Sequence, residues 1–276
     1  MFENRLKDLD NKLSKDNIEF KYFILTNGER EIYFKNTSKA VDFIKFKFDN
    51  SIKKKIIYYL IKIGMLQPFL KTIKLNNFFG DLIFIGGQIK CFDLNKEVVT
   101  SFPLYDFEDD FFIKNKLFQM KLTKGYSPKI YELNKERDYP FTKEELLERY
   151  TDGNYLKVFK KLYSFYEKYG IYRKNGLLYV KSHGDFSKEQ LLKKGNEIVF
   201  IDWNDEDMQL ITKDLYDFFI RNSKEKNPLK NKDFLEVLNI YPIEVKNNIK
   251  KYIELNSKDW KEELHSAKMA KLELKK

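Results

Sequence analysis

Residues 179–203 read YVKSHGDFSKEQLLKKGNEIVFIDW, and this stretch decides the fold that we expect for the chain. An extended run ends in a polar loop that contains His183 and Asp185. A Gly-Asn turn signal then precedes a second apolar run, Ile198–Ile201, which ends at Asp202. Because strands that converge at their ends bring the residues after them together, we expect Asp185 and Asp202 to share one site.

The residue types in this stretch favour phosphoryl transfer. Hard cations such as Mg²⁺ prefer oxygen ligands, which the carboxylate of Asp202 and the side-chain amide of Gln190 can supply. Asp185 is then free to accept a proton from an incoming hydroxyl, and the metal neutralises the phosphates. We expect His183 to play a supporting role through a hydrogen bond to the loop backbone, which is also the ordinary role of a lone buried histidine.

The triplet His183-Gly184-Asp185, together with Gln190 and Ile201-Asp202-Trp203, resembles the aminoglycoside phosphotransferase and choline kinase-like family. The resemblance covers about residues 120–220. It implies a protein-kinase-like, two-lobed α+β fold with a β-rich N-lobe and an α-rich C-lobe. It also implies that Asp185 is the catalytic base, that Gln190 and Asp202 hold Mg²⁺, and that ATP is the donor. Asp214 resembles the family's acidic residue that braces the catalytic loop, although a helix-face charge would look the same.

Three positions depart from the family pattern. The family usually has Asn where Gln190 stands. The strand expected to carry an ATP-phosphate lysine, residues 97–102, contains no Lys, and the helix expected to offer its Glu partner reads Ile-Lys-Asn-Lys at 113–116. We expect Lys90 on the neighbouring strand, paired with Glu108, to replace them. The turn Gly86-Gly87 could let the backbone approach the phosphates, or it could simply make a hairpin.

Three functions remain open from the sequence. The first is an ATP- and Mg²⁺-dependent kinase for a small-molecule hydroxyl of the sugar, amino alcohol or aminoglycoside class. The second is a degenerate pseudokinase that acts as a binding or scaffold module, which the missing lysine and glutamate favour. The third is nucleic-acid binding, but the lysines are scattered and match no recognised module. The acids Asp205, Glu206 and Asp207 could attract a cationic acceptor or form a solvated loop.

Composition narrows the class of protein. With 276 residues and 42% hydrophobic residues, the chain can bury a core in one large domain or two lobes. The net charge of +10 suggests acidic partners. The single Cys91 excludes an intramolecular disulfide framework and favours the cytoplasm. We identify no signal peptide, and no apolar stretch is long enough for a membrane-spanning helix.

The residue pattern predicts three parts. Residues 1–75 form an N-terminal extension of helices and a β-hairpin around Asn27-Gly28, residues 76–146 a β-rich nucleotide-binding lobe, and residues 147–276 an α-rich catalytic lobe. Helices are expected at 1–16, 38–48, 51–65, 109–122, 155–169, 210–221, 233–241, 243–255 and 260–274. Strands are expected at 20–25, 31–34, 82–85, 88–93, 97–102 and 129–133.

Two segments have two interpretations each. Thr142–Glu145 fits a helix capping box, but it could also be a strand that connects the lobes. Residues 51–66 begin with three lysines and continue into an apolar run, so they could lie on an anionic membrane surface. Because apolar residues nearly encircle the expected helix, the pattern favours a buried helix with a basic start.

Overall fold

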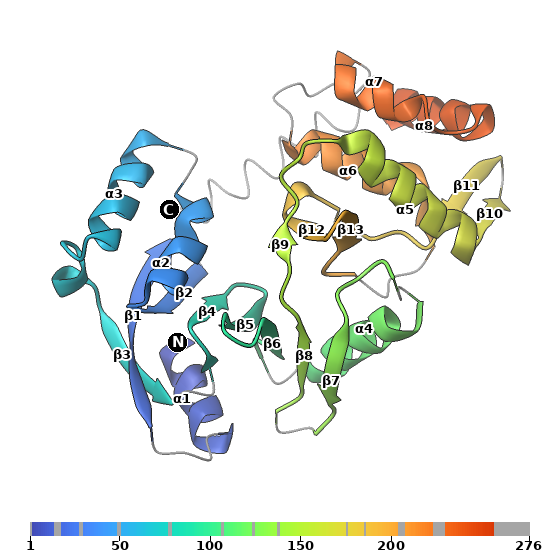
Figure 1. Cartoon of the computed structure of the whole chain (residues 1–276). Coiled ribbons are helices and arrows are strands. Elements are labelled where there is room, and N and C mark those ends of the chain that lie inside the picture. The colour runs from blue at the N-terminus through green and yellow to red at the C-terminus, as the bar shows by residue number, and fades with distance from the viewer. Residues whose placement is uncertain are drawn as a thin grey trace, which may run out of the picture. The chain divides into compact units, whose positions relative to one another are not determined.

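The computed structural model describes two compact units, which we call unit 1 (Met1–Leu147) and unit 2 (Glu148–Lys276) (Figure 1). Helices and antiparallel strands are mixed in both units, so the fold is α+β as the sequence predicts. The described residues are 2–13, 18–27, 30–48, 51–76, 79–105, 108–122, 125–136, 139–174, 176–184, 186–203, 208–222 and 230–256. The helix expected at 260–274 and the turn residue Gly28 lie outside them.

Unit 1 is built on one eight-stranded antiparallel sheet with the order β3-β1-β2-β4-β5-β6-β8-β7. We predicted a boundary near residue 75, but β2 and β4 pair directly, with Phe34 opposite Leu82, so the sheet continues across it. The strands are β1 (Glu19–Asn27), β2 (Arg30–Lys35), β3 (Thr72–Asn76), β4 (Leu82–Ile85), β5 (Gln88–Asp93), β6 (Val98–Pro103), β7 (Ile130–Asn134) and β8 (Phe141–Glu145).

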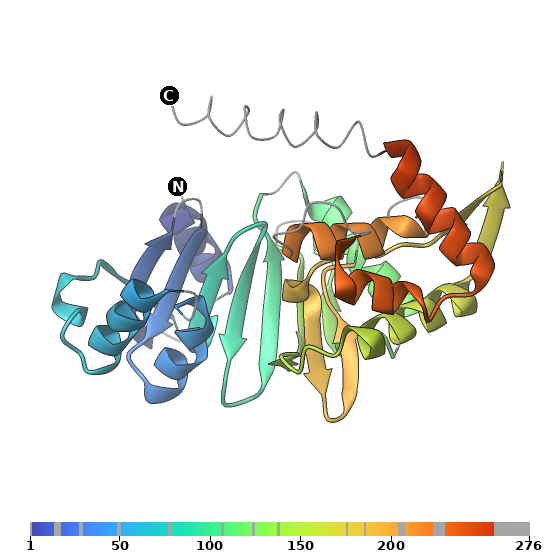
Figure 2. The ribbon, with the colours of Figure 1, turned by 90° about the horizontal axis from the view of Figure 1, so that it is seen from above.

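Helices cover both faces of this sheet, since side chains alternate between the faces along each strand. On β1, Tyr22 packs in the core that α1 covers, whereas Phe23 packs in the core beneath α2 and α3. Figure 2 shows α1 and the α2–α3 pair on the two sides of β1 and β2. The helices of unit 1 are α1 (Phe2–Leu13), α2 (Ser38–Ile44), α3 (Ile52–Lys62) and α4 (Asp109–Leu122), with 3-10 turns η1 (Lys45–Lys47) and η2 (Gln67–Phe69).

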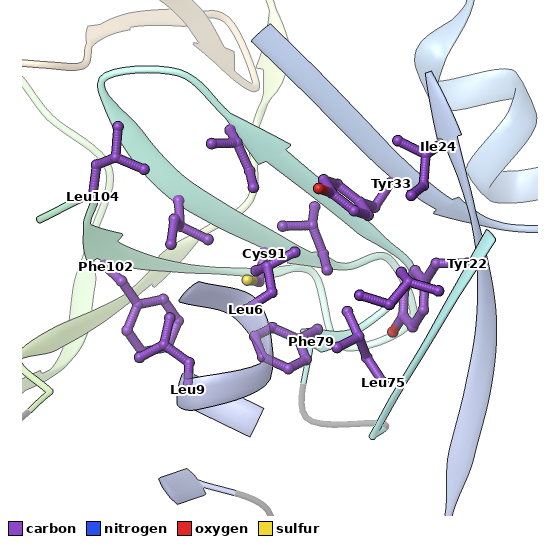
Figure 3. Close-up of a cluster of buried hydrophobic side chains, with 14 of the residues drawn as sticks. Leu6, Leu9, Tyr22, Ile24, Tyr33, Leu75, Phe79, Cys91, Phe102 and Leu104 are labelled. Carbon is purple, nitrogen blue, oxygen red and sulfur yellow. The ribbon is translucent and has the colours of Figure 1, made fainter. Parts of the chain in front are cut away.

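The core under α1 joins the N-terminal helix to the central strands. Figure 3 shows Leu6 and Leu9 of α1 directed toward Cys91 and Phe102. All four side chains are buried, and burial raises the pKa of the Cys91 thiol. The cysteine is therefore a small apolar core residue of β5. The first helix contributes to the same core as the strands that were expected to form a separate lobe.

The segment with two interpretations, Thr142–Glu145, is a strand. It belongs to β8, which pairs with β6 on one side and β7 on the other. Phe141 and Leu146, which would form the hydrophobic staple of a helix, pack in different cores on opposite faces of the sheet. Pairing on both edges of β8 outweighs the local capping signal.

The described residues of unit 2 form two three-stranded sheets and four helices. The sheets have the orders β10-β11-β14 and β13-β12-β9. Their strands are β9 (Glu148–Arg149), β10 (Ile171–Lys174), β11 (Leu177–Val180), β12 (Leu191–Lys194), β13 (Glu197–Phe200) and β14 (Gln209–Leu210). The helices are α5 (Tyr155–Tyr169), α6 (Thr212–Asn222), α7 (Lys232–Leu238) and α8 (Ile243–Asn256), with a 3-10 turn η5 (Lys188–Gln190).

Helix α5 supplies much of the core of unit 2. The side chain of Asn154 caps its first turn by accepting from the amide of Lys157 at 3.0 Å, and Gly170 ends it with a φ of 100°. The ring of Phe159 lies 5.8 Å from that of Phe186 and 5.2 Å from that of Phe218. Phe186 lies in the same loop as His183. Aromatic side chains of α5 and α6 therefore hold this loop in place through packing.

The prediction that residues 51–65 form a buried helix is wrong. Helix α3 buries Tyr58 and Ile61, but Ile52, Ile56 and Tyr59 are exposed. A helix that lies on one face of a sheet is covered on one side only, and α3 packs against α2 without a further layer among the described residues. None of the helices in the described part of the chain is long and apolar enough to span a bilayer.

Candidate active site

The loop between β11 and η5 is held by the carboxylate of Asp214. This residue lies in the first turn of α6 and is fully buried. The backbone amide of His183 donates to its Oδ2 at 2.6 Å, and the amide of Gly184 donates to its Oδ1 at 3.0 Å. Two successive amides thus point at the two oxygens of one carboxylate, and hydrogen bonds to an ionised acceptor are stronger than neutral ones. Asp214 therefore fixes the two peptide groups on either side of His183.

A tyrosine from α5 completes this arrangement. The Tyr166 hydroxyl donates to Oδ2 of Asp214 at 2.6 Å. Burial and the charge of Asp214 raise the pKa of Tyr166 well above its ordinary value, so its hydroxyl keeps its proton and stays a donor. Asp214 accepts three hydrogen bonds in total, from two loop amides and one phenol. This compensates for burying its charge.

His183 links the loop to the strand that leads to Asp202. Its ring is buried between Phe186 and Trp203, with ring centroids 5.1 Å and 4.8 Å away. Its Nε2 lies 2.7 Å from the carbonyl oxygen of Ile201, and because a carbonyl only accepts, Nε2 carries the proton. Desolvation lowers the pKa of His183, against a smaller opposing effect of the Asp214 charge. The imidazole is therefore neutral, and its contact is to the residue directly before Asp202.

Gln190 and the residue before Asp202 are neighbours across a hairpin. In the β12–β13 pair, Leu191 lies opposite Phe200, and the amide of Ile201 donates to the carbonyl of Gln190 at 3.1 Å. The pairing therefore reaches Gln190 on one strand and stops one residue before Asp202 on the other. The structure brings the backbones of the two predicted metal ligands together at the same end of the hairpin.

The backbone of Asp202 adopts an unusual conformation. Its φ of 62° lies in the left-handed region, where it is one of two non-glycine residues of the described chain. Aspartate tolerates this region better than most residues, and such conformations cluster at functional sites. The side-chain oxygen of Gln190 accepts a hydrogen bond from the Ser187 hydroxyl, which orients the amide and leaves that oxygen a second lone pair.

The predicted base, Asp185, lies outside the described residues, as do Asp205, Glu206 and Asp207. Its two neighbours are described: Gly184 is held by Asp214, and Phe186 is buried in the aromatic core. Near them, Ser182 Oγ and His183 Nδ1 are buried without a hydrogen-bond partner among the described residues. Buried polar atoms without protein partners are uncommon and often mark ordered water or a ligand site.

The predicted nucleotide residues of unit 1 lie in and around the β4–β5 hairpin. Gly86 and Gly87 form its turn; neither has a positive φ, and a Cβ at either would meet no atom within 4 Å. The turn is therefore open, but its backbone does not require glycine. Lys90 lies opposite Ser101 on β6, half-buried. Glu108, its predicted partner, accepts from the amide of Tyr105 at 3.3 Å.

Unit 1 contains a buried ion pair that the sequence did not reveal. Lys116 Nζ of α4 lies 2.6 Å from Oε1 of Glu144 on β8, with side-chain exposures of 4% and 10%. The Thr142 hydroxyl donates to the same oxygen at 2.8 Å. Directly opposite residues share a face, so Lys90, Ser101 and Thr142 form a row across β5, β6 and β8, and Glu144 lies on that face too. Helix α4, which follows β6, thus carries the lysine of this ion pair, and strand β8 carries its glutamate.

One signal in the sequence could have pointed to this ion pair. Lys116 shares α4 with the polar residues Asn115 and Gln119, which are buried as well, so a cluster of polar side chains on the buried side of this helix marked the site. Glu144 was missed because the capping-box interpretation placed it in the first turn of a helix, where an acid is common. Tyr166 was assigned to the core face of α5, where its ring does lie, and periodicity gives no sign of what its hydroxyl contacts.

Compared by sequence with known proteins, the chain matches no family model and no curated protein.

Proposed function

We propose that the chain is an ATP- and Mg²⁺-dependent phosphotransferase that acts on the hydroxyl of a small molecule. The observation that carries the proposal is the bond pattern of Asp214, which holds the amides of His183 and Gly184 immediately before Asp185. A catalytic base has to be held in place relative to the incoming hydroxyl. A buried carboxylate that binds two successive loop amides provides such support. In this function Asp214 is a positioning residue and Asp185 is the base.

His183 joins the two halves of the proposed site. Its amide is held by Asp214, and its Nε2–H donates to the carbonyl of Ile201. The backbone before Asp185 and the backbone before Asp202 are therefore tied through one buried, neutral imidazole. Any shift of one segment is transmitted to the other, which suits two carboxylates that must act on the same phosphoryl group.

The residues present fit a hard divalent cation. Gln190 offers an amide oxygen and Asp202 a carboxylate, both from the same end of the β12–β13 hairpin. Among the described residues no three His, Cys, Asp or Glu side chains gather as a metal site. Mg²⁺ needs only one or two protein carboxylates when phosphates complete its shell. When bound, the ion would neutralise charge on the transferred phosphate, while the Ser187 hydroxyl holds the Gln190 amide in orientation.

The nucleotide-binding groups are proposed to come from unit 1. Its strands β4, β5, β6, β8 and β7 follow one another in the sheet, with α4 inserted between β6 and β7. This arrangement supports a kinase-like lobe with the Gly86-Gly87 turn at the β4–β5 hairpin. Lys90 and Lys116 both lie on the face of Glu144, so each is a candidate for the cation that protein kinases place on the third strand.

A second function, the pseudokinase, is favoured by the same ion pair. The predicted strand of the phosphate lysine, β6, carries none, and the buried lysine of α4 is already bound to Glu144. If neither Lys90 nor Lys116 reaches a phosphate, neither candidate supplies the cation that the family uses to hold the nucleotide. The chain would then bind a partner through a fixed scaffold rather than transfer phosphate.

Thermal unfolding with ATP and Mg²⁺ distinguishes the two functions. A ligand at 100 times its dissociation constant stabilises the folded state by about 2.7 kcal/mol, which corresponds to a rise in Tm of about 5–10 °C. We expect this rise for the chain, and a smaller one for Asp202→Asn. Asparagine is chosen because it tolerates the φ of 62° at this position, so the variant loses charge without added backbone strain.

Asp185→Asn provides the matched test of chemistry. It should keep the ATP-dependent rise in Tm and lose ATP turnover, because a base is needed for transfer and not for nucleotide binding. Turnover that survives in Asp185→Asn would remove this residue from the role of base. No rise in Tm at millimolar ATP would contradict the phosphotransferase and favour the pseudokinase.

A further inference from the structure

Helix α3 exposes a stripe of large apolar side chains. Ile52, Ile56, Tyr59 and Ile63 recur at helical spacing, and at about 100° per residue they fall within an arc of about 60°. Ile61, which is buried, lies on the opposite side of the helix. Met65 and Phe69, which follow the helix in the chain, are exposed as well. We call these six residues the α3 surface; their exposed fractions are 80%, 55%, 63%, 63%, 62% and 82% in chain order.

The orientation of this helix is fixed, so the exposure does not come from a loosely attached segment. Tyr58 donates to Asp42 of α2 at 2.8 Å, and Lys62 binds the same carboxylate oxygen at 2.7 Å. Ser51 caps the first turn by accepting from the amide of Lys54 at 3.2 Å. After the helix, two side-chain hydrogen bonds of 2.8 and 2.6 Å join Gln67 to Asn36. The α3 surface faces outward because its opposite side is anchored.

Positive charge surrounds the stripe. Residues 38–71 contain eight lysines and two aspartates, a net charge of +6 in a chain whose total is +10. On the helix, Lys53 lies on one side of the stripe and Lys55 on the other, at about 90° and 70° from its centre. Both are exposed, and the charge of Lys62 on the second side is offset by Asp42. A row of apolar side chains thus lies between cations on both flanks.

We propose that the α3 surface docks on an anionic lipid bilayer. A helix that lies in the membrane interface buries its apolar face in the acyl boundary and places flanking lysines at the level of the lipid phosphates. The exposed isoleucines and aromatics between Lys53 and Lys55 match this arrangement. This docking is independent of the proposed phosphotransferase activity, and it places the full chain at a membrane surface without inserting it.

The alternatives fit the α3 surface less well. Nucleic acid would use the lysines but would leave the isoleucines in water, since phosphate contacts carry its sequence-independent binding. A stable protein interface requires roughly 800 Å² from each partner, whereas an 11-residue helix is only about 16 Å long. A bilayer accepts a narrow apolar stripe because lipid chains close around it.

Vesicle flotation with the full chain tests the proposal. We expect the protein to float with phosphatidylcholine vesicles that contain phosphatidylserine and to float far less with pure phosphatidylcholine. Ile56→Ser/Tyr59→Ser should weaken binding at least tenfold, because each removes exposed apolar surface from the stripe. Lys53→Gln/Lys55→Gln should also weaken it at least tenfold at low salt, because each lysine near an anionic surface contributes about a fivefold gain in affinity.

Matched substitutions elsewhere in unit 1 serve as controls. Phe111→Ser removes an aromatic side chain that is 58% exposed on α4, and Lys121→Gln/Lys135→Gln removes two exposed lysines. These variants should bind vesicles within about twofold of the parent chain. Because all the substituted side chains are exposed, circular dichroism and Tm should stay unchanged in every variant.

Three results would overturn the proposal. The first is failure of the chain to float with anionic vesicles. The second is equal flotation after Ile56→Ser/Tyr59→Ser, which would assign binding to charge alone. The third is an oligomer in size-exclusion chromatography without lipid that these two substitutions dissociate, which would make the α3 surface an interface between copies of the chain.

Discussion

The substitution Asp214→Asn tests the central feature of the candidate site. Asp214 is fully buried and accepts hydrogen bonds from the amides of His183 and Gly184 and from the Tyr166 hydroxyl. Asparagine keeps one acceptor oxygen and places an NH₂ group at the other position. If the oxygen takes the place of Oδ2, the Gly184 amide faces a donor and loses its partner.

The magnitude follows from these contacts. One buried donor without an acceptor costs about 1–3 kcal/mol, and the two remaining hydrogen bonds lose their charged acceptor at about 1 kcal/mol each. Removing a buried charge recovers part of this through lower desolvation. We expect Asp214→Asn to reduce the free energy of unfolding by about 2–4 kcal/mol.

Urea unfolding followed by tryptophan fluorescence is a suitable assay. Trp203 is buried in unit 2, so its fluorescence reports the unit that contains Asp214. Tyr166→Phe is the matched control: it removes one of the three donors and should cost about 1–2 kcal/mol. The double variant should cost less than the sum of the two. If Asp214→Asn unfolds within about 0.5 kcal/mol of the parent chain, its carboxylate does not support the loop.

Two further predictions concern buried charges. Burial lowers the pKa of His183, so the unfolded chain binds a proton at this imidazole more readily than the folded chain does. The free energy of unfolding should therefore be independent of this group above about pH 6.5 and should fall below that pH by up to about 1.4 kcal/mol per pH unit. His183→Gln, which keeps a donor for Ile201, should flatten that slope in urea titrations, and an unchanged slope would assign it to other groups. Lys116→Met should destabilise unit 1 by about 3–5 kcal/mol because it leaves Glu144 buried and unpaired, whereas Lys116→Met/Glu144→Leu should recover most of the loss. A double variant no more stable than the single one in thermal unfolding would contradict this explanation.

Local signals in the sequence predicted many elements well. The helix expected at 109–122 has the same bounds as α4, and the expected hairpin pairs β1, which ends at Asn27, with β2, which begins at Arg30. The apolar face predicted for α5 is the one that packs in the core. These features depend on residues close in sequence, where periodicity and turn chemistry decide the structure.

Features that depend on distant residues were not predictable. Glu144 becomes part of a strand because β6 and β7 pair with β8 on both edges, and it meets Lys116 only through that pairing. Helix α3 was expected to be buried because its composition is apolar on most sides, and composition does not tell how many layers cover a helix. The position of Asp214 next to His183 requires α6 to pack against the loop, which no local pattern specifies; it was expected only from the family resemblance.

The direct pairing of β2 with β4 determines where the chain can be shortened. A fragment that starts at residue 76 would retain β4 through β8 but remove the neighbour of β4, whose residues Leu82, Ile83 and Ile85 are buried in the whole chain. Strand β4 would then be an edge strand with unpaired backbone N–H and C=O groups and apolar side chains. Such edges pair with strands of other molecules. Residues 1–75 therefore act as the edge protection of the sheet, and fragments that lack them are expected to aggregate whatever residues 76–276 do on their own.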